Sequence, residues 1–194
     1  MINHLYDQFK HWSYVNQQSK NCIYLYSDPH FGDEEMKYLR ANYVGDEEQI
    51  KRINSKVSHN DTIIFLGDIG DINCIKKIHG YKILIMGNHE RGASNYTGVF
   101  NEVYEGPVMI SDRIMLSHEP LDLPPCIFNI HGHDHTLLYH EDRHLNLCAE
   151  HINYTPVSLN KLIKDGLLKD TESIHRITID HATERKLAKK LTIQ

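Results

Sequence analysis

Short apolar runs that end in polar residues recur along the chain, and this pattern predicts β-strands. The runs are CIYLYSD at 22–28, TIIFLGD at 62–68, KILIMGNH at 82–89, IMLSH at 114–118, IFNIHGH at 127–133 and HLNLCAE at 144–150. Runs as apolar as these are typical of strands that are buried on both faces. We therefore expect a sheet with both faces covered.

Helical patterns separate the early strands. In the segment DEEQIKRINSKV, Ile50, Ile53 and Val57 recur on one helical face, and acidic residues fill the first turn, where the helix dipole favours them. A shorter helix is predicted over INCIKKIHG. Near the end of the chain, Ser158 is a good N-cap for a helix over SLNKLIKDG. IHRITID then leads into the charged segment DHATERKLAKKL, which predicts a surface helix.

The order of these elements predicts the fold class. Strand, helix, strand order in the first half favours a parallel or mixed sheet with helices outside it. After residue 108 the strands follow one another closely, which predicts a second, more antiparallel sheet packed on the first. The 194 residues show no repeat or linker, so a single domain over 1–194 is expected. The predicted class is α/β, with two mixed β-sheets packed as a sandwich and flanking helices.

Composition narrows the classes of protein further. Hydrophobic residues make up 40% of the chain and charged residues 24%, which is ordinary for a globular protein. The formal net charge of -5 gives no general attraction to nucleic acid or to an anionic membrane. No signal peptide or membrane span is visible. The cysteines form no CxxC pair, which argues against a zinc ribbon and fits free thiols in a reducing cytosol. They are Cys22, Cys74, Cys126 and Cys148. These features predict a soluble, cytoplasmic protein.

Polar side chains with metal-binding atoms stand where the apolar runs stop. They are Asp28, His30, Asp68, Asn88, His89, His118, His131, His133 and His135. In open α/β sheets the carboxyl ends of the strands form the edge where ligands bind. Each short segment alone could be an ordinary turn. Together they indicate a metal centre of mixed carboxylate, amide and imidazole ligands, a set that suits Mn, Fe or Zn rather than a thiolate-bound metal.

The segments SDPHFG, GDIGD, GNHE, SHEP and GHDH, in this order, resemble the five sequence blocks of calcineurin-like metallophosphoesterases. The resemblance spans 23–135 and is specific, because all five blocks are present. Within that superfamily, the chain resembles above all the small bacterial and phage members. The resemblance implies the calcineurin-like metallophosphoesterase fold and a centre of two divalent cations. Manganese is expected first, with iron, nickel, zinc or magnesium as alternatives.

The resemblance also implies how the ligands divide between the two cations. One cation takes Asp28, His30 and His135, and the other takes Asn88, His118 and His133. Asp68 would bridge them, because the two oxygens of a carboxylate can reach two cations about 3.5–4 Å apart. The GHxH block selects the pair His133 and His135 over His131 and His133, and Gly132 leaves room for the backbone to approach the metals.

The function implied by the resemblance is enzymatic. It is a metal-dependent phosphoric ester hydrolase, in which metal-bound hydroxide attacks a phosphomonoester or phosphodiester. His89 matches the position that contacts phosphate and assists the leaving group as general acid. The substrate would be small or of nucleotide type. The GDIGD segment lacks the Arg-Gly pair that follows this block in protein Ser/Thr phosphatases, and in this respect the chain differs from that class. In the SDPHFG segment, Pro29 stiffens the turn between Asp28 and His30 without removing a ligand.

Other polar residues are candidates for substrate contact or for support of the ligands. His131 could support the metal ligands, contact substrate or be purely structural. The candidates for selectivity are Arg40, Tyr43, Arg91, Tyr96, Glu119 and His151. An arginine on a loop is more often simply solvated.

Two other functions fit the same residues. A catalytically weak binding or regulatory module could use the same fold, although it would be expected to lose His89 or metal ligands. A nuclease would share the metal blocks, but the acidic charge and the lack of a basic run count against it.

Overall fold

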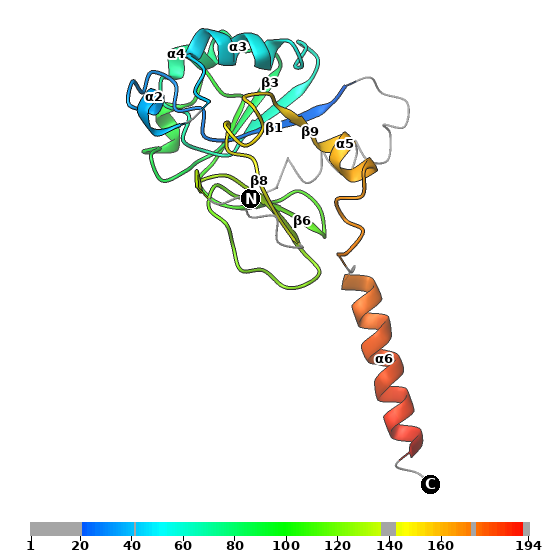
Figure 1. Cartoon of the computed structure of the whole chain (residues 1–194). Coiled ribbons are helices and arrows are strands. Elements are labelled where there is room, and N and C mark those ends of the chain that lie inside the picture. Colours follow the sequence, from blue (N-terminus) through cyan, green and yellow to red (C-terminus); the bar gives the residue numbers. More distant parts are fainter. Residues whose placement is uncertain (1–20, 41, 137–142, 172–173, 192–194) are drawn as a thin grey trace.

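The computed structural model describes residues 21–40, 42–136, 143–171 and 174–191 and is shown in Figure 1. The first sheet has the strand order β4-β3-β2-β1-β9. Its strands are β1 (Ile23–Tyr26), β2 (Thr62–Phe65), β3 (Tyr81–Ile85), β4 (Glu102–Tyr104) and β9 (Val157–Ser158). Strands β1 to β4 are parallel to one another, and β9 pairs antiparallel with β1. The first sheet is therefore mixed and has a parallel centre.

The second sheet has the order β5-β6-β7-β8. Its strands are β5 (Val108–Met109), β6 (Ile114–Leu116), β7 (Phe128–His131) and β8 (His144–Asn146). Apolar side chains of both sheets meet in one buried cluster that includes Leu25, Ile64, Ile83, Leu116 and Ile130. The chain is thus an α/β protein with two mixed sheets packed face to face, as the sequence predicts.

The second sheet is only marginally more antiparallel than the first, because one of its three strand pairings is antiparallel, against one of four in the first sheet. Only β5 and β6 are antiparallel, whereas β6 pairs with β7 and β7 with β8 in parallel. Antiparallel neighbours can be joined by a two-residue turn, but the connections 117–127 and 132–143 are long enough to return the chain to the same end of the sheet. As a result, β6 and β7 end at the same edge.

The helices are short apart from the last one. They are α2 (Met36–Leu39), α3 (Asp46–Asn54), α4 (Ile72–Ile75), α5 (Leu159–Lys164) and α6 (Ile174–Leu191), with a 3-10 turn η1 (Ala93–Asn95). In Figure 1, α3 and α4 lie on the side of the first sheet away from β6 and β8, and α6 extends away from the body. The Ser158 side chain accepts the Lys161 N–H, which confirms the predicted N-cap. The α4 helix is shorter than predicted because its last residues form i to i−3 bonds, such as Ile78 N–H to the Ile75 carbonyl at 3.1 Å.

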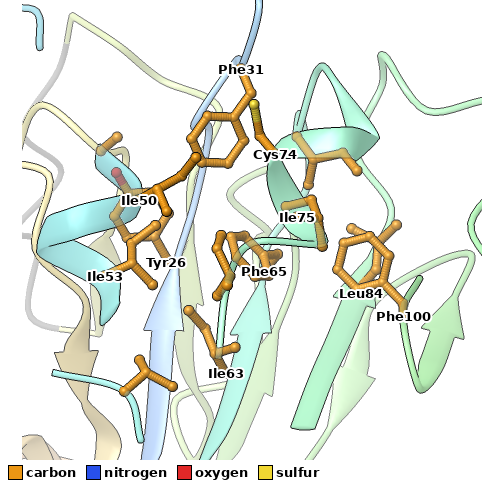
Figure 2. Packing of buried hydrophobic residues seen from close by; sticks show 14 of the residues in the cluster. Tyr26, Phe31, Ile50, Ile53, Ile63, Phe65, Cys74, Ile75, Leu84 and Phe100 are labelled. Carbon is orange, nitrogen blue, oxygen red and sulfur yellow. The ribbon is translucent and has the colours of Figure 1, made fainter. Parts of the chain in front are cut away.

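A second buried cluster fills the space between the first sheet and its helices. Figure 2 shows Ile50 and Ile53 of α3 beside Tyr26, and Ile75 of α4 beside Phe65. Neighbouring residues along β2 point into opposite clusters, since Ile64 faces the second sheet and Phe65 the helices. This alternation covers both faces of the first sheet and fixes its register.

Two further predictions concern the cysteines and membranes. All four cysteines are free thiols, and Cys74, Cys126 and Cys148 are buried, as expected for small apolar side chains. Of the helices that the described residues form, none is long and apolar enough to span a membrane.

Candidate metal centre

The carboxyl ends of five strands deliver the predicted ligands to one place. Strand β1 leads into Asp28 and His30, β2 into Asp68, and β3 into Asn88. In the second sheet, β6 leads into His118, and β7 into His133 and His135. The two sheets meet at this edge, where Ser27 forms a parallel bridge with Cys148. All seven predicted ligands therefore lie in one region.

The first group of ligand atoms comprises Asp28, His30 and His135. Asp28 Oδ1 lies 3.9 Å from His30 Nε2 and 3.6 Å from His135 Nε2. Two atoms that bind one cation at about 2.0–2.2 Å stand within about 4.4 Å of each other. The three side chains are therefore spaced as the ligands of one cation.

The second group comprises Asp68, His118 and His133, with Asn88 beside them. His118 Nε2 lies 3.4 Å from Asp68 Oδ2, 3.1 Å from His133 Nδ1 and 2.8 Å from Asn88 Oδ1. The atoms Asp68 Oδ2, His133 Nδ1 and Asn88 Oδ1 therefore all lie close to His118 Nε2. This group has the spacing of a second cation site.

Asp68 stands between the two groups. Its Oδ2 lies 3.7 Å from His30 Nε2 in the first group and 3.4 Å from His118 Nε2 in the second. Its Oδ1 accepts the backbone N–H of His89 at 3.1 Å, which holds the carboxylate in place. The geometry therefore allows Asp68 to contact cations in both groups.

Asp28 provides a test of whether the residues fit a cation. Its Oδ2 accepts the Ser27 hydroxyl, the Cys148 thiol at 3.4 Å and the His133 N–H at 3.0 Å. Its Oδ1 is buried without a hydrogen-bond partner among the described residues, and so is His30 Nε2. Buried polar atoms without partners are costly and rare. A cation bound by both atoms removes that cost, so the donor set fits a metal.

The histidine rings are oriented by their second nitrogen atoms. Nδ1 of His118 lies 2.8 Å from the Leu66 carbonyl, which can only accept, so this nitrogen carries the proton. The Nε2 of His118 therefore presents a lone pair to the site. Burial, together with the charge of Arg40, lowers the pKa of His30 and keeps its ring neutral. Neutral imidazole is the form that binds metals.

Left-handed backbone conformations occur at several of the ligands. Asp28, His30, Asp68 and His133 have φ values of 54°, 46°, 50° and 71°. Such values are uncommon outside glycine and persist where the surrounding structure holds them, which is typical of functional sites. A Cβ on Gly132 would lie 2.1 Å from Asp28 Oδ2, so the glycine of the GHDH segment is needed for the close approach of these loops.

Two glutamates that the sequence analysis gave no role, the buried Glu90 and the partly buried Glu150, support the proposed ligands. Glu90 accepts the N–H groups of Asp68, Ile69 and Gly87, at 2.9, 3.0 and 2.6 Å, and so ties the GDIGD turn to the GNHE turn. Glu150 Oε1 lies 2.6 Å from His135 Nδ1. Because Glu150 is the last residue of the run HLNLCAE, its position after a predicted strand is the signal that could have identified it.

Glu150 is held by Arg40, whose side chain is almost fully buried. Arg40 Nη1 lies 3.5 Å from Glu150 Oε2. Burial alone would raise the pKa of Glu150, but the bond to His135 and the charge of Arg40 outweigh it and lower this pKa. The ionised carboxylate accepts the Nδ1 proton of His135 and leaves its Nε2 facing Asp28. Arg40 therefore lies beneath the ligands and not at the rim, contrary to its proposed role in selectivity.

His135, Cys148 and Glu150 form a third cluster of potential ligands. Burial, followed by the charges of Asp28 and Glu150, raises the pKa of the Cys148 thiol far above its usual range, so the thiol stays protonated and acts as a donor. Arg40 Nη2 lies 3.4 Å from His135 Nδ1 and already supplies positive charge. This cluster supports the first group and does not form a separate cation site.

Replacement of Glu150 by glutamine tests this support. Glutamine retains the shape but loses the charge, and we expect metal affinity at the first site to fall about 10- to 100-fold, as is typical for partners of metal-bound histidines. Titration of the metal-free protein with Mn²⁺ measures the change. Exchange of the exposed Glu34, which pairs with Lys37, for glutamine is the control. Unchanged Mn²⁺ affinity in the Glu150 variant would show that this carboxylate does not orient His135.

His89 is placed differently from the seven ligands. Its side chain is 66% exposed, and its Nε2 lies 3.8 Å from Asp68 Oδ2. Its ring meets that of His30 edge to face with centroids 5.5 Å apart. It thus borders the ligand groups while remaining open to solvent, where a substrate can reach it.

The other candidates are mostly occupied within the fold. His131 is fully buried and packs against the ring of His144, so a structural role fits and substrate contact does not. Arg91 donates to the carbonyls of Asn88 and Glu90. Tyr43 packs on Tyr154, Tyr96 packs on Phe100, and His151 bonds to the Asp134 carbonyl. Of the candidates for selectivity, Glu119 lines a cavity beside Asn88 and His118.

Comparisons with known proteins place the chain among proteins whose names state no activity. No protein-family model matches the sequence. The chain is 30% identical to the uncharacterized protein MJ1445 of Methanocaldococcus jannaschii, over 75% of this chain and 92% of that protein. The crystal structure of AQ665, a protein of unknown function from Aquifex aeolicus, matches with a TM-score of 0.65 and 24% identity, over 75% of this chain and 99% of that one. The likeness to AQ665 shows a shared fold.

Proposed function

The chain belongs to the same family as the Methanocaldococcus jannaschii protein MJ1445, and we propose that it is a dinuclear metal-dependent phosphoesterase. The substrates would be phosphomonoesters or phosphodiesters with a small or nucleotide-type organic group. The two packed mixed sheets, with ligands at the strand ends, support the assignment of the calcineurin-like fold.

One observation carries this proposal. Asp68 Oδ2 lies within 3.7 Å of histidine nitrogens from two separate ligand groups. A carboxylate shared in this way is the feature that distinguishes a two-metal site from two unrelated clusters. The motif resemblance and the geometry agree on the same seven residues.

The chemistry follows from these residues. Two bound cations would supply a water of lowered pKa and neutralise charge on the phosphoryl oxygens. Asp28, His30 and His135 would hold one cation, and Asp68 would contact both. The remaining ligands, Asn88, His118 and His133, would hold the second. Manganese is our first choice of metal, because the oxygen and nitrogen donors include no thiolate.

His89 supplies the proton chemistry that this reaction requires of the protein. Its exposed ring borders both groups, and imidazole is the side-chain group that most often serves as a general acid. We assign to it contact with the phosphoryl group and donation of a proton to the leaving oxygen. Its presence with all seven ligands favours catalysis over a purely binding or regulatory module.

Hydrolysis by the metal-stripped protein tests the proposed function. We expect bis-p-nitrophenyl phosphate or p-nitrophenyl phosphate to be hydrolysed only after a divalent cation is added back, with Mn²⁺ compared with Fe²⁺, Ni²⁺, Zn²⁺ and Mg²⁺. The ratio of diester to monoester activity then identifies the preferred ester. Absence of hydrolysis while two cations are demonstrably bound would favour the binding module instead.

A further inference from the structure

A cavity of about 210 Å³ opens beside the second ligand group. Asn88 and His118, two of the proposed ligands, form part of its wall. This volume equals that of about seven water molecules in the liquid, at about 30 Å³ for each molecule. It can hold a small organic group but not a macromolecule. The cavity is therefore the right size for a substituent of a phosphate ester that reaches away from the metals.

The walls of the cavity come from both sheets. Glu105 and Pro107 lie between β4 and β5, whereas Glu119 and Leu121 follow β6. Met86, which follows β3, adds a half-buried apolar side chain. The cavity is thus part of the folded frame that also positions Asn88 and His118, and it combines apolar wall with two carboxylates.

The two carboxylates give the cavity its chemical preference. Glu105 and Glu119 are both exposed, and within the described ranges of the chain no ion pair involves either of them. Their negative charge favours a cationic group and repels a further phosphate or carboxylate. The apolar side chains of Met86 and Leu121 favour a hydrocarbon portion.

We propose that this cavity binds the organic group of the substrate and selects a small alkylammonium substituent on the phosphate ester. The inference rests on the proposed phosphoesterase function and names its substrate class. It predicts discrimination against nucleoside polyphosphates and nucleic acids, whose additional phosphates would face Glu105 and Glu119.

Two phosphodiesters with the same leaving group test the inference. p-Nitrophenyl phosphorylcholine carries a quaternary ammonium, bis-p-nitrophenyl phosphate carries a neutral aromatic group, and both release p-nitrophenolate. The ratio of their kcat/KM values therefore reports the second substituent. In the Mn²⁺-loaded protein, we expect the double variant Glu105→Gln/Glu119→Gln to lower the choline-to-aryl ratio about five- to tenfold, since each exposed charge pair contributes modestly.

Controls separate this effect from a change in overall charge. Glu47, whose side chain is 79% exposed on α3, is changed to glutamine as the matched variant, and the ratio should stay at the wild-type value. A ratio that is the same in the wild type and the double variant overturns the inference and leaves the phosphoesterase function intact. Absence of metal-dependent hydrolysis of both esters would overturn the proposed function, and the inference with it.

Discussion

Replacing Asp68 with asparagine should abolish most of the activity and reduce the bound metal from two cations per chain to one. Asparagine can retain the hydrogen bond from the His89 N–H, but it lacks the second negatively charged oxygen that faces His30 and His118. Loss of a partner outside the ligands costs about 10- to 100-fold, so loss of the shared ligand should lower kcat/KM more than about 10³-fold. Hydrolysis assays and elemental analysis measure the two effects.

The second aspartate of the GDIGD segment is the matched control for this variant. Asp71 caps α4 by accepting the Asn73 N–H, and asparagine caps helices equally well. Asp71→Asn should therefore keep both cations and full activity. An Asp68→Asn protein that binds two cations and hydrolyses esters at the wild-type rate would show that Asp68 is not shared between sites.

Replacing His89 with alanine should lower kcat about 10²- to 10⁴-fold, the usual contribution of a general acid, while both cations stay bound. The loss should be larger for phenyl phosphate esters than for p-nitrophenyl esters, because the poorer leaving group depends more on proton donation. His89 makes contact through its ring with His30 and Asp68 but is not grouped with either set of ligands. Steady-state kinetics with both esters, together with metal analysis, give the answer.

A remote exposed histidine provides the control for His89. His59 lies before β2, at the opposite end of that strand from Asp68, and its ring packs on that of His79. His59→Ala should leave kcat unchanged. If His89→Ala loses metal in proportion to its activity, or loses activity equally with both leaving groups, His89 is not the general acid.

The position of the site could be predicted because it depends on strand order and polarity. Five of the six apolar runs lead into a proposed ligand, and the carboxyl ends of β1, β2 and β3 meet at one edge because those strands are parallel. The seven proposed ligands therefore follow from the pattern and the motif resemblance, and the structure places their side chains in one region. The parallel pairing of β6 with β7 and of β7 with β8 could not be predicted in this way, because the direction of neighbouring strands depends on where the long connections between them run.

The residues that hold the proposed ligands in place were harder to predict than the ligands themselves. Glu150 lies far from Arg40 in sequence, and their contact exists only after the segments that follow β1 and β8 come together at Ser27 and Cys148. Arg40 looked like a solvent-facing arginine of an early segment, yet its side chain is buried beneath His135. Such long-range contacts between charged residues leave no periodic signal in a single sequence, because they depend on the packing of the two sheets.

A Mn²⁺ titration of the metal-free protein, monitored by electron paramagnetic resonance, tests whether the Asp68 carboxylate links two cations in this chain. We expect two Mn²⁺ ions per chain and a spectrum of two exchange-coupled ions, with the coupling lost in Asp68→Asn. A single bound ion, or two ions whose spectra are independent of each other, would contradict the dinuclear centre.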